Sequence, residues 1–318
     1  MTPASRSLAR PTGTNDGEPD LITIVCLSFN TRDYISRCFD ALIAQQTDYR
    51  FEIVVHDDAS SDGSQDIIRD YADRFPEIFK PVLQQTNRWS QGFCPLQACA
   101  PYIKGAFVAI CEVDDYWTEI DKLQQQVDYL VSSGRNFVGT QCRSITPNDS
   151  LGPAFPKADS AGPITIIQGS HIYEMRKYIH TSTFAMRRKL FAKWVAAFTR
   201  QVVSADLTIL LTACLVDDGL AMQNRVTSRY RIHEGGVWTS STRFVRYARY
   251  AATWQSVLEA LEGELPPKYR RIAEDNLAYF YALSEKQSSR LLSMIRRRGP
   301  RPVIRVWYNL LARRLLGN

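Results

Sequence analysis

The sequence of 318 residues contains no long hydrophobic run. Its most apolar segment, 207–216, is shorter than the ~18 residues that cross a bilayer, and Asp206 and Asp217 flank it. Residues 1–20 are rich in Pro, Thr, Gly, Ser and Asp and lack the apolar core of a secretory signal, so we predict a disordered leader there. These absences lead us to expect a cytoplasmic protein without a transmembrane helix.

The patterns of cysteine, histidine and glycine that mark several enzyme classes are absent as well. The seven cysteines form no Cys-x-x-Cys pair, which is typical of buried thiols in a reducing compartment. None of the four histidines has the His-x-x-x-His spacing of a zinc hydrolase. Gly-x-Gly-x-x-Gly, the P-loop pattern and Gly-x-Ser-x-Gly are also missing, which disfavours Rossmann dehydrogenases, P-loop kinases and α/β-hydrolases.

The first part of the chain alternates short β-branched runs with amphipathic segments. We predict strands at 21–27, 51–56, 79–84 and 106–111, each followed by a helix: 33–45, a helix ending near 74, 92–103 and one around 123–130. Four such repeats with short loops favour an α/β fold, with a mostly parallel, Rossmann-like sheet and helices on both faces. Ligands bind such sheets at the carboxyl ends of the strands.

Three polar clusters follow predicted strands at that edge, at 28–30, 57–58 and 114–115. A single carboxylate after a strand is most simply a solvated surface group, but three clusters that converge on one edge indicate a site. The adjacent Asp114 and Asp115 suit Mg²⁺ or Mn²⁺, which prefer oxygen ligands and leave positions open for substrate phosphates. A nucleotide held through a metal ion and through acidic side chains fits this pattern.

Beyond residue 135 the regular pattern weakens. Strand-like pieces at 136–145 and 177–186 flank a Pro- and Gly-rich loop at 147–163, followed by a helix at 204–215 and a strand at 224–230. From 243 onward the pattern is helical. We therefore predict one α/β domain over 21–242, with a nucleotide-binding half at 21–135 and an acceptor half at 136–242, and a helical extension over 243–318.

Five segments in this order resemble family 2 glycosyltransferases with the GT-A fold, of the type found in bacterial polysaccharide biosynthesis. They are Leu21–Asn30, Asp57-Asp-Ala-Ser-Ser-Asp-Gly-Ser64, Cys111-Glu-Val-Asp-Asp-Tyr-Trp117, His180-Thr-Ser-Thr183 and Tyr230-Arg-Ile-His-Glu-Gly-Gly-Val-Trp238. The resemblance covers about 21–240. Val113 stands where the family often has Gly, which would add a side chain near the donor site.

The resemblance implies donor-side roles for the matching residues. Ser28 and Asn30 would lie beside the nucleotide, and Asp58 would bind its base, usually uracil or thymine. Asp114 would approach the ribose or the donor sugar. Asp115 would bind the metal, Mn²⁺ or Mg²⁺, that bridges the diphosphate.

Asp206 lies where the family places its catalytic base, which would deprotonate the acceptor hydroxyl in an inverting displacement. The alternative is an N-cap on the helix that begins there, a role that Ser204 fits too. His233 matches a position that can add a metal or diphosphate contact, but it fits an ordinary loop histidine equally well.

Four further residues near these motifs have structural interpretations. Tyr116 and Trp117 fit core packing as well as a platform for a sugar. Asp57 is expected to orient its loop rather than contact the donor. His180 is expected to have a structural or acceptor-side role rather than to bind the metal.

We thus predict an inverting, metal-dependent glycosyltransferase that moves a sugar from a UDP- or dTDP-sugar to a saccharide or lipid-linked acceptor. One alternative is a catalytically inactive module that binds nucleotide sugar or acts as a scaffold, which the intact Asp115 and Asp206 disfavour. The other is a sugar-phosphate nucleotidyltransferase, which would need a Gly-rich, basic loop in place of Ser28-Phe-Asn-Thr31.

Positive charge is concentrated at the end of the chain. Residues 286–318 hold nine basic side chains and no acidic one, so that 1–285 has 30 basic and 33 acidic residues although the whole chain has a net charge of +6. On a helix, 303–316 would place most of its apolar residues, including Trp307, on one side, as in a peripheral anchor on an anionic membrane. The alternative is a helix packed on the domain or on a second subunit. No motif accompanies the charge to indicate nucleic-acid binding.

Overall fold

The computed structural model describes residues 17–159, 161–199, 202–236 and 240–284. The predicted basic tail at 286–318 and nearly all of the predicted leader at 1–20 therefore lie outside the described residues. Within the described ranges, no helix has both the length and the apolar character needed to cross a membrane.

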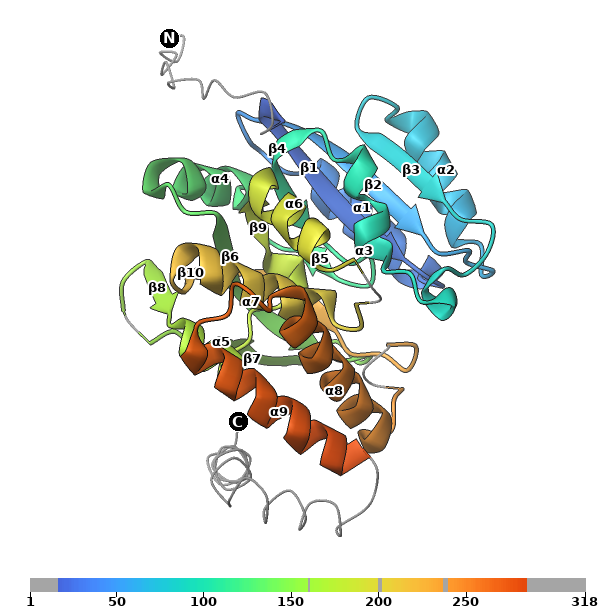
Figure 1. Ribbon diagram of the computed structural model, residues 1–318. Helices are drawn as coiled ribbons and strands as arrows, with labels where there is room; N and C mark the ends of the chain where they lie inside the picture. Colours follow the sequence, from blue (N-terminus) through green and yellow to red (C-terminus); the bar gives the residue numbers. More distant parts are fainter. Residues whose placement is uncertain (1–16, 160, 200–201, 237–239, 285–318) are drawn as a thin grey trace.

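A mixed β-sheet runs through the molecule (Figure 1). Its strands are β1 Glu18–Ser28, β2 Arg50–Asp57, β3 Phe79–Leu83, β4 Gly105–Ile110, β5 Tyr116–Trp117, β6 Phe137–Ile145, β7 Leu151–Phe155, β8 Ile164–Ile167, β9 Ala185–Arg187 and β10 Leu220–Arg231. Their order is β3-β2-β1-β4-β9-β6-β10-β5, with β7 beside β6 and β8 beside β10. The strands β1 to β4 pair in parallel, whereas β9 is antiparallel to both β4 and β6.

Helices cover both faces of this sheet (Figure 1). They are α1 Arg32–Ile43, α2 Ser64–Arg74, α3 Pro95–Ala98, α4 Lys122–Ser133, α5 Gly169–Tyr173, α6 Arg188–Ala197, α7 Ala205–Asp217, α8 Arg243–Ala260 and α9 Pro267–Ser284. Successive residues of a strand point to opposite faces. Ile24 accordingly packs in the cluster with α1, α2 and α4, and Val25 packs in the cluster with α6 and α7. The predicted α/β architecture with helices on both faces is confirmed. The sheet is mixed rather than mostly parallel, because β5, β7, β8 and β9 pair antiparallel with their neighbours.

Two local predictions for the middle of the chain are wrong. The helix expected at 92–103 is reduced to α3, flanked by 3₁₀ turns at Trp89–Gln91 and Ala100–Tyr102, because Pro95 and Pro101 cannot donate the backbone hydrogen bonds of a continuous helix. The strand expected at 177–186 exists only as the short β9. The residues before it form an irregular segment with a 3₁₀ turn at Thr181–Thr183.

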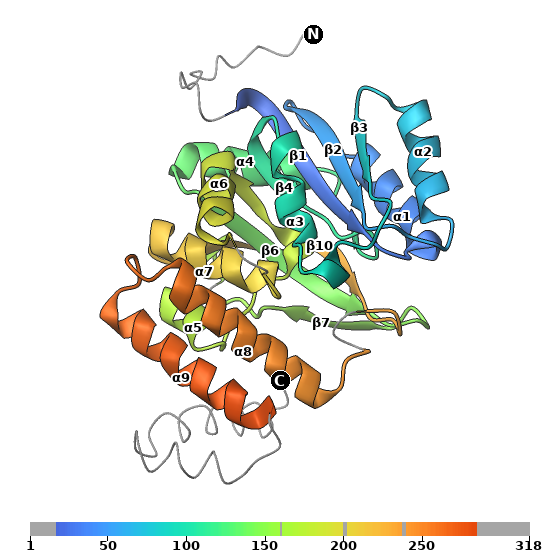
Figure 2. The same cartoon turned by 45° about the vertical axis from the view of Figure 1, so that its right-hand side comes forward.

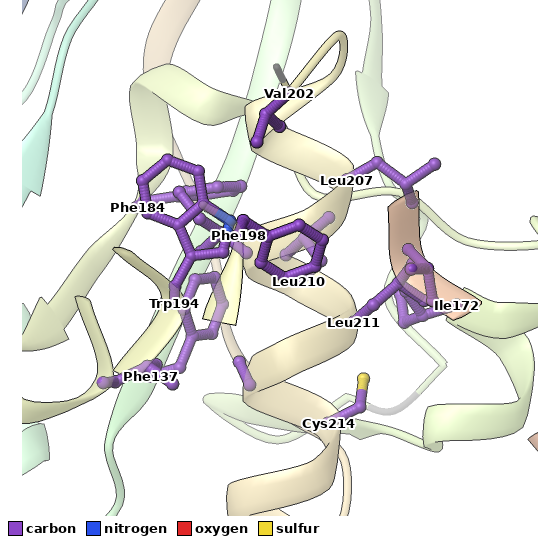
Figure 3. Packing of buried hydrophobic residues seen from close by; sticks show 14 of the residues in the cluster. Phe137, Ile172, Phe184, Trp194, Phe198, Val202, Leu207, Leu210, Leu211 and Cys214 are labelled. Atoms are coloured by element: carbon purple, nitrogen blue, oxygen red, sulfur yellow. The ribbon is translucent and has the colours of Figure 1, made fainter. Parts of the chain in front are cut away.

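The helices after residue 242 share the core of the α/β unit. Trp254 of α8 and Ile272 of α9 belong to the same buried cluster as the residues of α6 and α7 shown in Figure 3. Two views of the molecule show α8 and α9 side by side beneath α5 and α7 (Figure 2). The boundary between 242 and 243 stays a prediction.

Candidate active site

The loops that follow β1 and β2 are tied together by polar side chains. Asp57 accepts hydrogen bonds from Ser28 Oγ (2.8 Å), the backbone N–H of Ser60 (2.8 Å) and Gln65 Nε2 (2.8 Å). Asn30 has a left-handed backbone (φ 53°), and its side-chain oxygen accepts from the N–H of Ser61 (3.0 Å). Asp57 thus orients its loop, as we expected, and Ser28 and Asn30 are held at the carboxyl end of β1.

Asp58 is 3% exposed and holds a third loop in place. Its two carboxylate oxygens accept the backbone N–H groups of Arg88 (2.8 Å) and Trp89 (2.9 Å). A carboxylate has about four lone-pair positions, so each oxygen can accept a further bond. Its oxygens therefore keep acceptor capacity for the predicted contact with a nucleobase, which stays a prediction.

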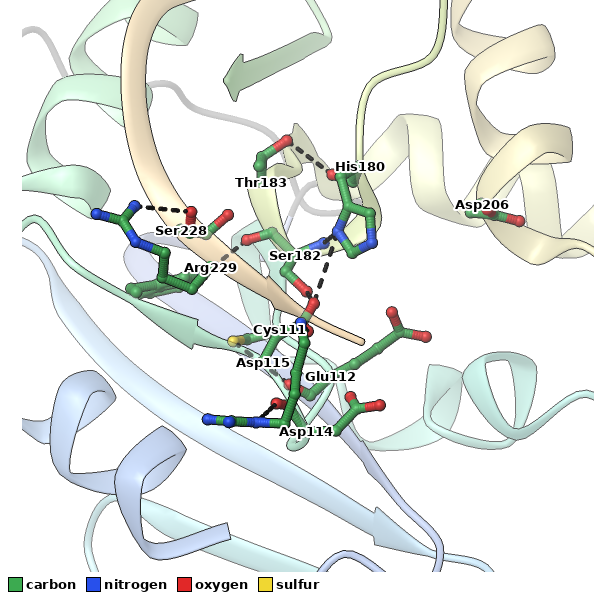
Figure 4. Close-up of polar contacts among 12 residues, drawn as sticks. Cys111, Glu112, Asp114, Asp115, His180, Ser182, Thr183, Asp206, Ser228 and Arg229 are labelled. Carbon is green, nitrogen blue, oxygen red and sulfur yellow. Dashed lines mark hydrogen bonds and ion pairs between the residues drawn. The ribbon is translucent and has the colours of Figure 1, made fainter. Parts of the chain in front are cut away.

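Asp115 follows β4 in the chain and is almost fully buried, with 1% of its surface exposed. Its carboxylate accepts hydrogen bonds from Ser182 Oγ and from the backbone N–H of Arg231 (2.9 Å), and His180 Nδ1 lies 3.6 Å away (Figure 4). Burial, and after it the charge of Asp114, raises the pKa of Asp115 well above its usual range. The irregular segment at 178–184 therefore brings polar groups onto this carboxylate.

Glu112, Asp115 and His180 form a candidate metal centre. Their ligand atoms all lie within 4.8 Å of one another. Burial and the charges of Asp114 and Asp115 raise the pKa of Glu112, whereas burial lowers the pKa of His180 to about 4 and so keeps its imidazole neutral. Two crowded carboxyl groups and a neutral imidazole can hold a divalent cation, which would offset the burial and the mutual repulsion that raise the pKa values of the two carboxyl groups.

His233 lies beside this group and contacts a different aspartate. Its Nε2 is 3.1 Å from Asp114 Oδ2, and its ring packs 4.9 Å from the ring of Tyr34. The side chain of Asp114 is 28% exposed. The role of His233 as a metal ligand stays a prediction, and the geometry makes Asp114 its immediate partner.

Sequence reasoning missed two members of the metal-centre candidate. Glu112 stands within the quoted Cys111–Trp117 motif but was given no role, and His180 was expected to be structural or acceptor-side. The signal available for Glu112 was its place at the end of β4, beside two other acidic residues. His180 could not be placed, because its contact with Asp115 joins residues far apart in the sequence.

Asp206 lies in the first turn of α7, on a separate element from the acidic cluster (Figure 4). Ser204 occupies the N-cap position, although its side chain makes no capping hydrogen bond. The carboxylate of Asp206 accepts a hydrogen bond from the hydroxyl of Tyr178. Burial raises the pKa of Asp206, while the Tyr178 hydroxyl and the backbone N–H groups at the helix start lower it. Asp206 is therefore turned toward Tyr178, and the capping position belongs to Ser204.

The remaining residues of the motif after β4 pack inward. Val113 is fully buried in the cluster that lies against α1 and α4, away from the polar groups. Trp117 is 3% exposed and donates from Nε1 to the carbonyl of Ser182 (2.7 Å). The guanidinium of Arg37 lies 3.9 Å from the centre of the Tyr116 ring. These contacts favour core packing for both aromatic residues.

Comparison with known proteins defines the class. Residues 23–195 match the sequence profile described as glycosyl transferase family 2. The chain is 30% identical over 253 residues to an uncharacterized protein of Mycobacterium tuberculosis, Rv1520, covering 76% of this chain and 69% of that protein. It is 22% identical over 251 residues to an Escherichia coli protein named UDP-Glc:alpha-D-GlcNAc-diphosphoundecaprenol beta-1,3-glucosyltransferase WfaP, covering 75% of this chain and 87% of that protein.

Solved structures share the fold. Staphylococcus aureus TarS 1-349 in complex with UDP-GlcNAc aligns with a TM-score of 0.59 and 18% identity, covering 91% of this chain and 79% of that one. The mannosyltransferase PcManGT of Pyrobaculum calidifontis, in complex with GDP-Man and Mn²⁺, aligns with a TM-score of 0.55 and 18% identity, covering 93% and 76%. The fold is therefore the GT-A α/β fold followed by a helical region. The chain belongs to glycosyl transferase family 2 and is a glycosyltransferase.

Proposed function

We propose that this glycosyltransferase is metal-dependent and inverting, and that it transfers a sugar from a UDP- or dTDP-sugar to a saccharide or lipid-linked acceptor in polysaccharide biosynthesis. One observation carries the proposal: the candidate metal centre of Glu112, Asp115 and His180 has a separate carboxyl group, Asp206 at the head of α7, near enough for its charge to act on Glu112. An inverting transfer needs a site for the leaving diphosphate and a base on the acceptor side.

The described residues divide between these two tasks. Glu112, Asp115 and His180 would hold the divalent cation, which when bound would neutralise negative charge on the leaving diphosphate. Asp206 would accept the proton of the attacking acceptor hydroxyl.

The donor nucleotide would lie along the edge formed by the ends of β1, β2 and β4. Ser28, Asn30 and Asp58 are already held there by hydrogen bonds, so they would meet the nucleotide with little rearrangement. Asp114 would approach the ribose or the donor sugar, with His233 beside it.

The nature of the acceptor is supported by the relatives. WfaP is named for a glucosyl transfer from UDP-Glc to a sugar linked to diphosphoundecaprenol, and the TarS structure holds UDP-GlcNAc.

Thermal-shift measurements with UDP-, dTDP- and GDP-sugars in the presence of Mn²⁺ test the donor class. We expect the largest stabilisation from a UDP- or dTDP-sugar, and a preference for a GDP-sugar would argue against the base contact assigned to Asp58.

Activity measurements on two variants test the reaction itself. We expect Asp206→Asn to lower kcat by about 10²- to 10⁴-fold, the range for loss of a general base. We also expect Asp115→Ala to lose Mn²⁺-dependent turnover. Asp73→Asn, on the exposed side of α2, is the matched control and should retain full activity. If donor turnover were unchanged in Asp115→Ala, the metal assignment would be wrong. If the unmodified protein bound nucleotide sugar without turning it over, the inactive-module alternative would be favoured.

We also propose a cytoplasmic location with peripheral attachment to the inner face of the membrane. The support is the basic composition of 286–318, which lies outside the described residues. Co-sedimentation with vesicles of anionic phospholipid tests this, using the full chain and a variant that ends at residue 285. If the shortened chain still bound the vesicles, residues 286–318 would not be the membrane anchor. A change of oligomeric state on shortening would instead support self-association through this tail.

A further inference from the structure

The irregular segment before β9 presents alternate side chains to the candidate site. Tyr178 contacts Asp206, while His180 and Ser182 contact Asp115. Between them, Ile179 is fully buried in the hydrophobic core. The backbone is extended at His180 and turns at Thr181–Thr183, and this one short segment touches both the candidate base and the candidate metal centre.

The contact between Tyr178 and Asp206 is a direct hydrogen bond from the phenol hydroxyl to Oδ2. The Tyr178 ring packs against the hydrophobic core and meets the ring of His180 edge-on, with centroids 6.3 Å apart and planes at 86°. An ionised carboxyl group can only accept, so the Tyr178 hydroxyl is the donor of this bond.

We propose that Tyr178 is a positioning residue for the transfer reaction: its hydroxyl holds the carboxylate of Asp206 in one orientation toward the acceptor and ties it to the segment that carries His180 and Ser182. This inference rests on the proposed role of Asp206 as the base. Tyr178 itself donates to the carboxylate and exchanges no proton with the substrate.

The hydrogen bond from Tyr178 affects the ionisation of Asp206. A hydrogen bond to the charged form of a carboxyl group favours ionisation, so Tyr178 opposes the effect of burial and keeps the base in its proton-accepting form. Other titratable groups act on the same site: the carboxyl of Glu112 and the thiol of Cys94 both lie near enough to Asp206 for mutual charge effects. Removing the hydroxyl leaves these groups and the burial unchanged.

The test is Tyr178→Phe in the full chain, with a donor sugar and an acceptor at saturating Mn²⁺. Because the ionised base is the active form, the rate rises with pH through the pKa of Asp206. We expect the acid limb in the pH profile of kcat to shift to higher pH by about one unit. At a pH below the midpoint of that limb, kcat should therefore be about tenfold lower than in the unmodified protein. KM for the donor should stay the same, since the donor contacts other residues.

Tyr71→Phe is the matched control. Tyr71 donates a 2.6 Å hydrogen bond to Asp40 on the far side of the α1–α2 layer, so it repeats the same pairing away from the site. This variant should leave both kcat and the pH profile unchanged. An unchanged acid limb in Tyr178→Phe, with only a lower melting temperature, would overturn the proposal, because a merely structural tyrosine would affect stability and not the pH profile.

A double variant separates this proposal from the assignment of the base. In the Asp206→Asn background, Tyr178→Phe should cause no further loss of kcat, since the group that Tyr178 positions is gone. A full multiplicative loss would overturn the positioning role. Retained activity of Asp206→Asn alone would instead overturn the base assignment.

If Tyr178→Phe does not unfold cooperatively, 3-fluorotyrosine placed at position 178 alone gives the second measurement. Its more acidic hydroxyl is a stronger donor, so the acid limb should move to lower pH. An unchanged limb would overturn the proposal.

Discussion

At the scale of single residues, the site concentrates negative charge where the fold gives it little solvation. Asp115 is 1% exposed and adjoins Asp114 and Glu112, and its hydrogen-bond donors are a serine hydroxyl and a backbone N–H. Burial disfavours the ionised carboxyl group, which raises its pKa in the folded chain. Without a cation, the ionised form of Asp115 therefore lowers the stability of the protein.

This leads to a prediction about the metal-free protein. Folding raises the pKa of Asp115 above its unfolded value of ~3.9. Below that value the carboxyl group is protonated in both states and does not lower the free energy of unfolding. As the pH rises above it toward the folded pKa, the free energy of unfolding decreases. Asp115→Asn removes the buried charge. Its one side-chain oxygen can still accept from the N–H of Arg231, and its amide can donate to Ser182 Oγ in place of the bond that Ser182 now donates. We therefore expect its melting temperature in EDTA at pH 7 to rise by a few degrees, with a smaller gain at pH 4.

Differential scanning fluorimetry with EDTA and then with excess Mn²⁺ measures both parts of this effect. The unmodified protein should gain stability on adding Mn²⁺, and Asp115→Asn should gain much less. A lower melting temperature of the variant in EDTA at pH 7 would show that the hydrogen bonds of Asp115 outweigh the burial of its charge.

At the scale of elements, α4 supports the segment that carries His180 and Ser182. Gln126 is buried on the inner side of α4 and donates from Nε2 to the carbonyls of Thr183 (2.8 Å) and Val138 (3.3 Å). Lys122, one turn earlier, donates to Gln126 Oε1 (2.5 Å), and burial lowers its pKa to about 7. The helix thus acts as a second layer behind the candidate metal centre.

We predict that Gln126→Leu loosens that layer. The substitution keeps a similar volume but leaves buried carbonyl groups and Lys122 without their partner, which costs about 1–3 kcal/mol for an unsatisfied buried group. Urea unfolding should show this loss, and calorimetric titration should show weaker Mn²⁺ binding because His180 and Ser182 lose their support.

The neighbouring side chain supplies the control. Gln125 is exposed on the same helix, and Gln125→Leu should change neither stability nor Mn²⁺ affinity appreciably. Equal effects of both substitutions would show that the loss reflects the helix surface rather than the contacts of Gln126.

At the scale of the whole molecule, local patterns and distant contacts account for different parts of the structure. The strands β1, β2 and β4 were predictable because each carries a short run of mostly apolar and β-branched residues, and their ends placed Ser28, Asp58 and Asp115 on one edge. The segment at 178–184 has no such period. Its shape is set by distant contacts, such as that of Ser182 with Asp115 and Trp117, which a single sequence does not display. The effect of proline on helix formation was underestimated too, since Pro95 and Pro101 prevent the continuous helix expected at 92–103.

The helices α8 and α9, which follow residue 242, pack on the α/β unit through buried contacts. Trp254 is fully buried, the ring of Tyr269 in α9 stacks 4.2 Å from Tyr173 in α5, and Asn276 donates to the carbonyl of Tyr173 (2.8 Å). Loss of 243–318 would therefore expose apolar surface of α5 and α7 that these helices now cover.

We expect a chain that ends at residue 242 to aggregate or to unfold without a cooperative transition, whereas a chain that ends at 284 should unfold cooperatively. Trp254→Ala in the full chain gives a graded version of the same test, with an expected loss of about 3–5 kcal/mol in urea unfolding, because a large buried side chain leaves a cavity. Circular dichroism during urea titration distinguishes the outcomes. A soluble 1–242 fragment with the cooperative transition of the full chain would establish an independent α/β domain and reduce α8 and α9 to an appended layer.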